Sequence, residues 1–112
     1  MQSIVLDTSF ILAAVEKKID FFDILEGRGF QILVPQQAIR ELQGLGAMLA
    51  LQILRKNKFR TIRLPGKDAD TAILAFAKRN PGAVMATLDK GLQKKLKNRK
   101  LVIRGHKRLE IS

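Results

Sequence analysis

The chain has 112 residues, 46% of them apolar, which fits one globular domain and excludes a fully disordered chain. Lys and Arg number 21 against 10 Asp and Glu, giving a net charge of +11, so we expect an anionic partner, with nucleic acid as the first candidate. Cysteine is absent and there is a single histidine, which excludes disulfides, thiol nucleophiles, cysteine-ligated zinc and His-rich metal sites.

Short apolar runs that alternate with helix-length segments predict an α/β fold. Four runs without polar alternation are expected to be buried strands: 4–6, 32–34, 83–86 and 101–103. Helices are expected over 9–15, 19–26, 35–45, 48–54, from Asp68 to the stop at 80–82, and over 91–97. Repetition of strand and helix through residues 1–112 predicts one domain with a parallel sheet covered by helices on both faces.

Several acidic residues follow the expected strands. Asp7 comes directly after 4–6 and Asp89 directly after 83–88, so parallel strands would bring both carboxylates to one edge of the sheet. Glu41 lies on the helix after the second strand, and Asp70 lies in the first turn of the helix after residue 67. Each Asp could also be a helix N-cap, and Glu41 could be a solvated helix residue. Capping, however, does not explain why two strands end in an acid at the same edge.

A group of carboxylates at one edge of the sheet indicates a metal site. Several carboxylates cannot share a site fully ionised without a compensating cation, and magnesium and manganese prefer oxygen ligands. Such an ion can activate a water and neutralise charge on a phosphodiester, while basic residues hold the polyanion. The combination is typical of a metal-dependent nuclease.

Four short motifs, in this order along the chain, resemble those of the PIN-domain ribonucleases: 6–9, 34–35 with 41–42, 68–73 and 86–89. Two longer segments, 41–54 and 86–97, resemble the small ribosomal-RNA-processing branch of that family more than the neighbouring toxin branch. The resemblance implies a three-layer α/β/α PIN-like fold with a central, mostly parallel sheet. It also implies an endoribonuclease that depends on Mg²⁺ or Mn²⁺.

The same resemblance assigns roles to individual residues. It implies that the catalytic and metal-binding acids are Asp7, Glu41, Asp70 and Asp89. Related sequences often carry two adjacent acids where this chain has Asp70 followed by Thr71, and Asp68 either substitutes in part or only caps the helix. The residues that resemble the hydroxyl groups supporting the acids are Thr8, Ser9 and Thr87.

A basic segment follows the last of these acids. Its members, which we expect to contact RNA phosphates rather than only to solvate a helix face, are Lys94, Lys95, Lys97, Arg99 and Lys100. A second basic group spans 55–63, and His106 is expected at the surface or on a phosphate. The phenylalanines fit core positions, and the lack of Tyr and Trp argues against a base-stacking platform.

These observations favour an endoribonuclease acting on structured RNA, such as a precursor of ribosomal RNA. One alternative is the toxin of a toxin–antitoxin pair with the same chemistry and an antitoxin as partner. Another is a catalytically weak RNA-binding factor with a ribosome-assembly partner. No apolar run approaches the roughly 20 residues that span a bilayer, and no signal peptide is expected, so we predict a cytoplasmic protein without membrane contact.

We also predict a homodimer, because a small domain gains stability by burying apolar helix faces. The candidates for its interface are Phe10, Ile11, Phe21, Phe22, Met48 and Leu49.

Overall fold

The computed structural model describes residues 2–112 and holds one six-stranded sheet in the order β3-β2-β1-β4-β5-β6. The strands are β1 (Gln2–Leu6), β2 (Phe30–Pro35), β3 (Arg60–Ile62), β4 (Val84–Ala86), β5 (Lys100–Arg104) and β6 (Arg108–Ile111). Neighbouring strands from β3 to β5 pair in parallel, and only β6 runs antiparallel to its neighbour β5. The mostly parallel sheet and its four apolar strands are therefore confirmed.

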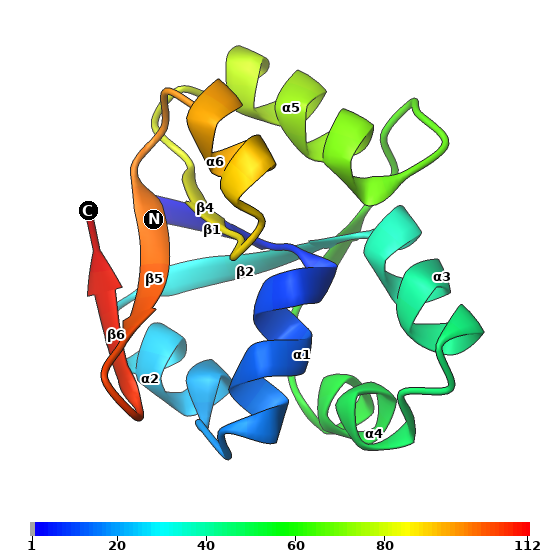
Figure 1. The fold of residues 1–112 in the computed structure, drawn as a ribbon, viewed down its shortest axis with the longest axis vertical. Helices are drawn as coiled ribbons and strands as arrows, with labels where there is room; N and C mark the ends of the chain where they lie inside the picture. The colour runs from blue at the N-terminus through cyan, green and yellow to red at the C-terminus, as the bar shows by residue number, and fades with distance from the viewer. Residues whose placement is uncertain (1) are drawn as a thin grey trace.

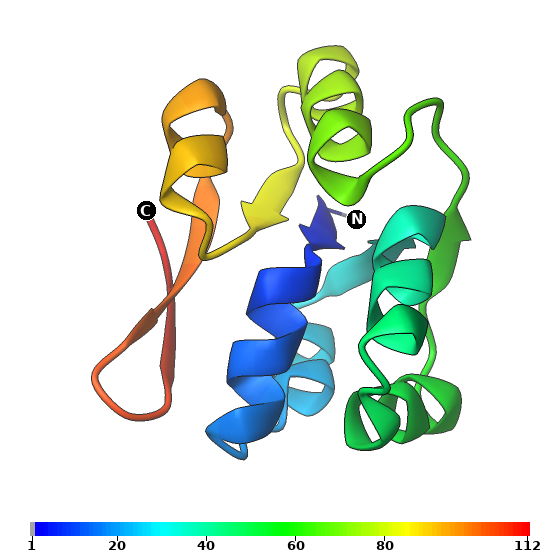
Figure 2. The same ribbon diagram turned by 45° about the vertical axis from the view of Figure 1, so that its right-hand side comes forward.

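Six helices connect the strands. They are α1 (Thr8–Glu16), α2 (Phe21–Gly27), α3 (Gln36–Gly44), α4 (Met48–Lys56), α5 (Ala69–Arg79) and α6 (Lys90–Lys95). Helices α5 and α6 cover one face of the sheet, and α1, α2 and α4 cover the other (Figures 1 and 2). This arrangement confirms the three-layer α/β/α fold. None of the helices in the described residues is long and apolar enough to cross a bilayer.

The helix boundaries follow local chemistry. Gly46 lies between α3 and α4 with φ of 66°. This left-handed backbone, which glycine adopts without strain, separates the two helices. Asn80 caps the C-terminus of α5, and its side-chain amide donates a hydrogen bond to the Phe76 carbonyl. Helix α3 lies at the carboxyl edge of the sheet, where it contacts α1, α4 and α5. It therefore joins segments from both helical layers next to the ends of β1 and β2.

Two strands were not predicted, for different reasons. Strand β3 is a three-residue edge strand whose Arg60 and Thr61 are exposed, so it carries no apolar run. Strand β6 lies in the basic tail and has no buried apolar run, because only Leu109 of its four residues is buried. The pairing of β6 with β5, rather than its own composition, makes it a strand.

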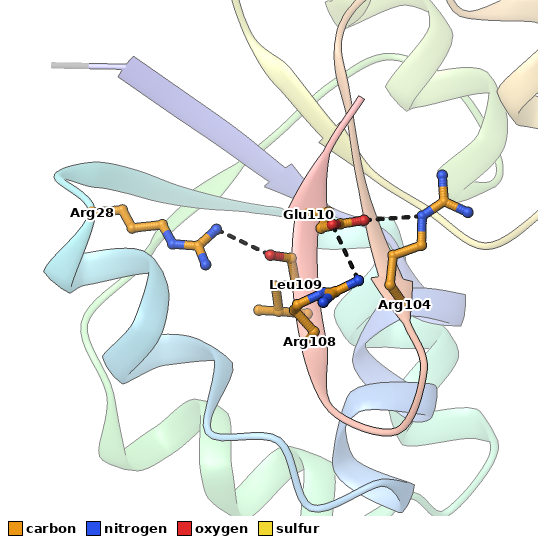
Figure 3. Close-up of polar contacts among 5 residues, drawn as sticks. All are labelled: Arg28, Arg104, Arg108, Leu109 and Glu110. Carbon is orange, nitrogen blue, oxygen red and sulfur yellow. Dashed lines mark hydrogen bonds and ion pairs between the residues drawn. The ribbon is translucent and has the colours of Figure 1, made fainter.

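The β5–β6 hairpin neutralises part of the basic tail. Glu110 forms ion pairs with Arg104 at 3.1 Å and with Arg108 at 3.4 Å, both exposed to solvent (Figure 3). Arg28, next to the C-terminus of α2, donates a hydrogen bond to the Leu109 carbonyl at 3.3 Å. His106 is exposed in the hairpin turn, as predicted. The tail is therefore less available to an anion than its charge count suggested.

Four of the six residues predicted for a dimer interface belong instead to the core, so that part of the prediction is wrong. Phe10, Ile11, Phe21 and Phe22 are at most 1% exposed within this single chain, because they fill the layer between the sheet and α1 and α2. Such side chains cannot meet a second copy without unfolding the core. By contrast, the exposed large apolar residues lie around the α3–α4 connection, at 65%, 61% and 59%: Leu45, Met48 and Leu49.

The core around Phe10 yields a stability prediction. Its ring packs edge-on to Phe21 with centroids 5.7 Å apart, and it is fully buried. Phe10→Ala should lower the free energy of unfolding by about 3–5 kcal/mol, because the change removes buried surface and leaves a cavity. Urea denaturation measures the loss. Phe59→Ala, at a half-buried ring 6.2 Å from Phe22, should cost clearly less, and equal losses would contradict the packing.

Candidate active site

Asp7 stands at the carboxyl edge of the sheet, directly after β1 as predicted. It is the N-cap of α1 and only 3% exposed. Its backbone N–H donates to the Ala86 carbonyl at 2.9 Å, which ties the end of β1 to the end of β4. The position of this carboxylate is thus fixed by the two central strands.

The Asp7 carboxylate is held by three donors. Its Oδ1 accepts the Thr8 backbone N–H at 2.8 Å, and its Oδ2 accepts the hydroxyls of Thr87 at 2.7 Å and Ser9 at 3.0 Å. These three hydrogen bonds offset the cost of burying a carboxylate. The Ser9 hydroxyl also accepts the Leu88 backbone N–H at 3.0 Å. The predicted supporting hydroxyls therefore join the start of α1 to the segment that leads to Asp89.

Glu41, on α3, connects α1 to α5. Its Oε1 accepts the Thr8 hydroxyl at 2.6 Å, and its Oε2 accepts the Ala69 backbone N–H at 3.2 Å. Ala69 is the first residue of α5, so the carboxylate satisfies a helix N–H that has no partner within the helix. Glu41 is half-buried and engaged at both oxygens. Glu41 therefore ties the start of α5, which carries Asp70, to the start of α1.

Asp68 and Asp70 differ in their surroundings although they are two residues apart. Asp68 is exposed and caps α5, and its carboxylate accepts the Thr71 backbone N–H at 2.8 Å, which lowers the pKa of Asp68. Asp70 is also exposed, but its pKa is raised, first by the loss of water where its carboxylate faces the protein and then by the negative charges of four neighbouring acids: Asp7, Asp89, Asp68 and Glu41. All four predicted acids therefore share one region of the carboxyl edge.

Asp89 lies at the same edge, in the loop between β4 and α6. Strand β4 ends at Ala86, so Asp89 lies three residues beyond the strand rather than directly after it, and it caps α6. Its Oδ1 accepts the Leu92 backbone N–H at 3.1 Å. A Cβ at Gly91 would stand 3.3 Å from the same oxygen, so glycine leaves this carboxylate room. The loop between Thr87 and Asp89 replaces the strand end that the sequence suggested.

The acids have the donor chemistry for a hard divalent cation, but they are not gathered into a chelate. Within residues 2–112, no three Asp, Glu or His side chains lie close enough together to hold one metal ion. Carboxylate oxygens are nevertheless the ligands that Mg²⁺ and Mn²⁺ prefer, and a cation here would relieve the repulsion that raises the pKa of Asp70. Asp70 and the Oδ2 of Asp89 accept no hydrogen bond from the described residues.

The basic segment extends away from the acids. Lys94 and Lys95 lie in the last turn of α6, and Lys97 and Arg99 are exposed beyond it. Lys100 is half-buried in β5, and its amine donates to the Asn98 carbonyl at 3.0 Å, so it is less available than the others. Asp89 and these lysines thus occupy opposite ends of α6, about 9 Å apart along its axis.

Sequence reasoning missed a buried glutamine that supports the site. Gln37 lies one turn before Glu41 on α3, and its amide donates to the carbonyls of Leu64 at 2.7 Å and Gly66 at 3.0 Å. These bonds anchor the loop that leads to Asp68 and Asp70. A glutamine on an amphipathic helix carries no signal of burial, so only the packed structure identifies it.

A family model described as a PIN-like domain matches residues 4–107. This chain belongs to the PIN-like domain family. Its fold is similar to that in a solved structure titled "Structure of the PIN domain endonuclease Utp24", with a TM-score of 0.85 and 23% identity, covering 98% of this chain and 90% of the other. A search among curated proteins gave no match. The predicted family and PIN-like fold are confirmed.

The raised pKa of Asp70 predicts how stability depends on pH. The folded protein binds this proton more tightly than the unfolded chain does, so the ionised carboxylate destabilises the fold. This loss of folding stability is absent below the ordinary carboxyl pKa of 3.8, where Asp70 is protonated in both the folded and the unfolded protein. It develops as the pH rises through the raised pKa of Asp70 in the folded protein. Without divalent metal, Asp70→Asn should therefore raise the melting temperature at pH 7, and the gain should disappear as the pH falls below 4.

Thermal unfolding followed by circular dichroism, in buffers containing a chelator, checks this expectation. Asp68→Asn is the control, because it removes a carboxylate whose pKa is lowered and should change the melting temperature in the opposite direction at pH 7. If Asp70→Asn produced no gain at pH 7, the charges of the four acids would not meet at Asp70.

Proposed function

We propose that this PIN-like domain is an endoribonuclease that depends on a divalent metal ion. The observation that carries the proposal is that four separate elements each place an acid at the carboxyl edge of the sheet: Asp7 before α1, Glu41 on α3, Asp70 in the first turn of α5 and Asp89 before α6. The raised pKa of Asp70, caused first by desolvation and then by the neighbouring acids, agrees with this placement. Four carboxylates from separate elements at one edge of a sheet are costly unless a cation offsets them. The PIN domain of the endonuclease Utp24, which has the same fold, supports this assignment.

In this proposal the four acids have different roles. Asp70 and Asp89, whose carboxylates keep oxygens that accept no hydrogen bond from the described residues, would hold Mg²⁺ or Mn²⁺. Asp7 would join them only as the side chains close around the ion, because no three acids of the described residues are gathered into a chelate beforehand. Such an ion, when bound, lowers the pKa of a water ligand and neutralises charge on the phosphodiester. The hydroxyls of Ser9 and Thr87 donate to the Asp7 carboxylate and keep it oriented. Glu41 holds the start of α5, and hence Asp70, against α1.

RNA is the substrate that fits the charge of the molecule. Lys94, Lys95, Lys97 and Arg99 are exposed, and no ion pair engages them among the described residues. A role in processing ribosomal RNA belongs to this proposal through the family branch that the sequence motifs resemble. The toxin and assembly-factor alternatives, homodimerisation and the cytoplasmic location remain predictions.

The acids should be needed for cleavage but not for binding. Asp7→Asn should reduce cleavage by more than about 100-fold, beyond the 10- to 100-fold typical of residues that only support metal ligands. RNA affinity should change little, because binding rests on contacts of Lys and Arg with phosphates. Cleavage of single-stranded and hairpin RNA with Mg²⁺ or Mn²⁺, alongside filter binding, measures both quantities.

Asp68→Asn provides the matched control, because its exposed carboxylate caps α5 and should matter less for cleavage. Equal cleavage by the wild type and Asp7→Asn would place the activity at another site or in a contaminating nuclease.

RNA affinity should fall steeply with salt through the basic segment. Each cation that neutralises a phosphate releases counterions, so log affinity falls by roughly 0.7 per contact per log unit of salt for a single strand. Replacing Lys94, Lys95 and Lys97 together by Gln should flatten that slope by about two units. Binding should weaken similarly for all RNA sequences, because lysines contact phosphates rather than base edges.

The matched control replaces an equal number of exposed cations around the end of α4: Arg55, Lys56 and Lys58. It lowers the net charge equally, so a flattened slope in the control and an unchanged slope in the first variant would move the RNA path to α4.

A further inference from the structure

A groove of about 350 Å³ lies between α5 and the end of α6, away from the acidic edge. The two helices contact each other on the same face of the sheet (Figures 1 and 2). Its apolar lining comes from Leu74 and Ala77 of α5, Pro81 after it and Leu96 after α6. The size falls within the range of pockets that take a small organic ligand.

Lysines surround this apolar floor. Lys78, Lys95 and Lys97 line the groove, all three are exposed, and no acidic residue lines it. The only ion pairs among the described residues involve Glu110 on β6, so none of the three amines has an acidic partner. An apolar floor within a ring of free cations is complementary to a ligand that combines a flat apolar part with negative charge.

Asn98 adds a buried polar group to the lining. It is 7% exposed, and its amide nitrogen donates to the carbonyls of Asn80 at 2.9 Å, Ala83 at 3.0 Å and Ala77 at 3.4 Å. Its Oδ1 accepts no hydrogen bond from the described residues and is not among the enclosed unpaired atoms. With the nitrogen fixed by three carbonyls, the oxygen is the side-chain atom left to accept a hydrogen bond from a ligand.

The groove lies within reach of an RNA strand at the acidic edge. Helix α5 begins beside Asp70, and Lys78 is eight residues further along it, or about 12 Å at the helical rise. Helix α6 likewise runs from Asp89 to Lys95. A strand advances about 3.4 Å per nucleotide in a stacked conformation, so roughly four nucleotides span this distance.

We infer that the groove between α5 and α6 holds one unpaired nucleotide of the RNA strand. The base lies on the floor formed by Leu74, Ala77 and Leu96 and donates a hydrogen bond from an amino or imino N–H to the Asn98 Oδ1. The phosphates on either side contact Lys78, Lys95 and Lys97. The inference rests on the proposed function, because it extends the path of the same substrate, and it adds a contact with a base to contacts with phosphates.

Methyl NMR locates the base directly. The wild-type protein, labelled at Leu and Ala methyl groups and kept metal-free with a chelator to prevent cleavage, is titrated with a single-stranded hexaribonucleotide. A matched hexamer with abasic riboses carries the same phosphates without bases. We expect the intact RNA to shift the Leu74, Ala77 and Leu96 methyl resonances, and the abasic strand to leave them in place.

Two further probes test the other occupants. A poly-glutamate peptide supplies charge and carboxylates without bases, and inorganic polyphosphate supplies charge alone. If either shifts the three methyl groups as strongly as the RNA does, the groove is an anion or peptide site and the inference is wrong. Shifts of equal size with the abasic strand would overturn it in the same way.

Substitutions measure the energetic contribution of the floor. Leu74→Glu should weaken binding of the hexamer about tenfold, the size of one lost base contact, whereas Leu74→Met, which keeps an apolar floor, should stay near the wild type. Leu51→Glu on α4 is the control, because it places the same charge at a half-buried leucine on the other face. Equal weakening by Leu74→Glu and Leu51→Glu would remove the groove from the RNA path.

The experiments distinguish failure of the groove inference from failure of the proposed nuclease function. Metal-dependent cleavage by the wild type without base-dependent methyl shifts would retain the nuclease and discard the groove. Base-dependent shifts at Leu74 and Leu96, with no cleavage under any divalent metal, would retain the groove and discard the nuclease.

Discussion

The buried carboxylate of Asp7 is the constraint on which the site depends. A charge that is 3% exposed needs donors, and here they come from Thr8, Ser9 and Thr87. Because the first two begin α1 and the third follows β4, satisfying one carboxylate fixes two segments that are about 80 residues apart in sequence. The Thr8 hydroxyl and Glu41 then extend the same network to the start of α5.

The acidic and basic side chains lie at opposite ends of α5 and α6. Helices α5 and α6 both begin at an acidic cap, and both end in lysine or arginine. The arrangement agrees with the helix dipole, which favours anions at the first turn and cations at the last. It also places the acids at one end of the helix pair and the free amines at the other. An anionic strand along these helices would meet cations before it reaches the carboxylates.

Most of the fold could be predicted from the sequence because its strands are short, apolar and covered on both faces, as in β1 and β4. Strands β3 and β6 could not, because they lie at the sheet edges, where one exposed side tolerates residues such as Arg60 and Arg108. Phe10, Phe21 and Phe22 could equally have formed a core or an interface. Periodicity marks an apolar face but does not say what covers it.

The sequence by itself determined the chain order of the four apolar strands and the six helices, the family, and which acids lie near which elements, because these depend on local patterns and short motifs. Only the tertiary structure decided that both oxygens of Glu41 are engaged, that Asp68 is a solvated cap and that the charges of four acids meet at Asp70. It also revealed the loop contacts of Gln37 and the groove beside Asn98. Hydrogen bonds and electrostatic fields depend on distances between segments remote in sequence, and folding alone sets those distances.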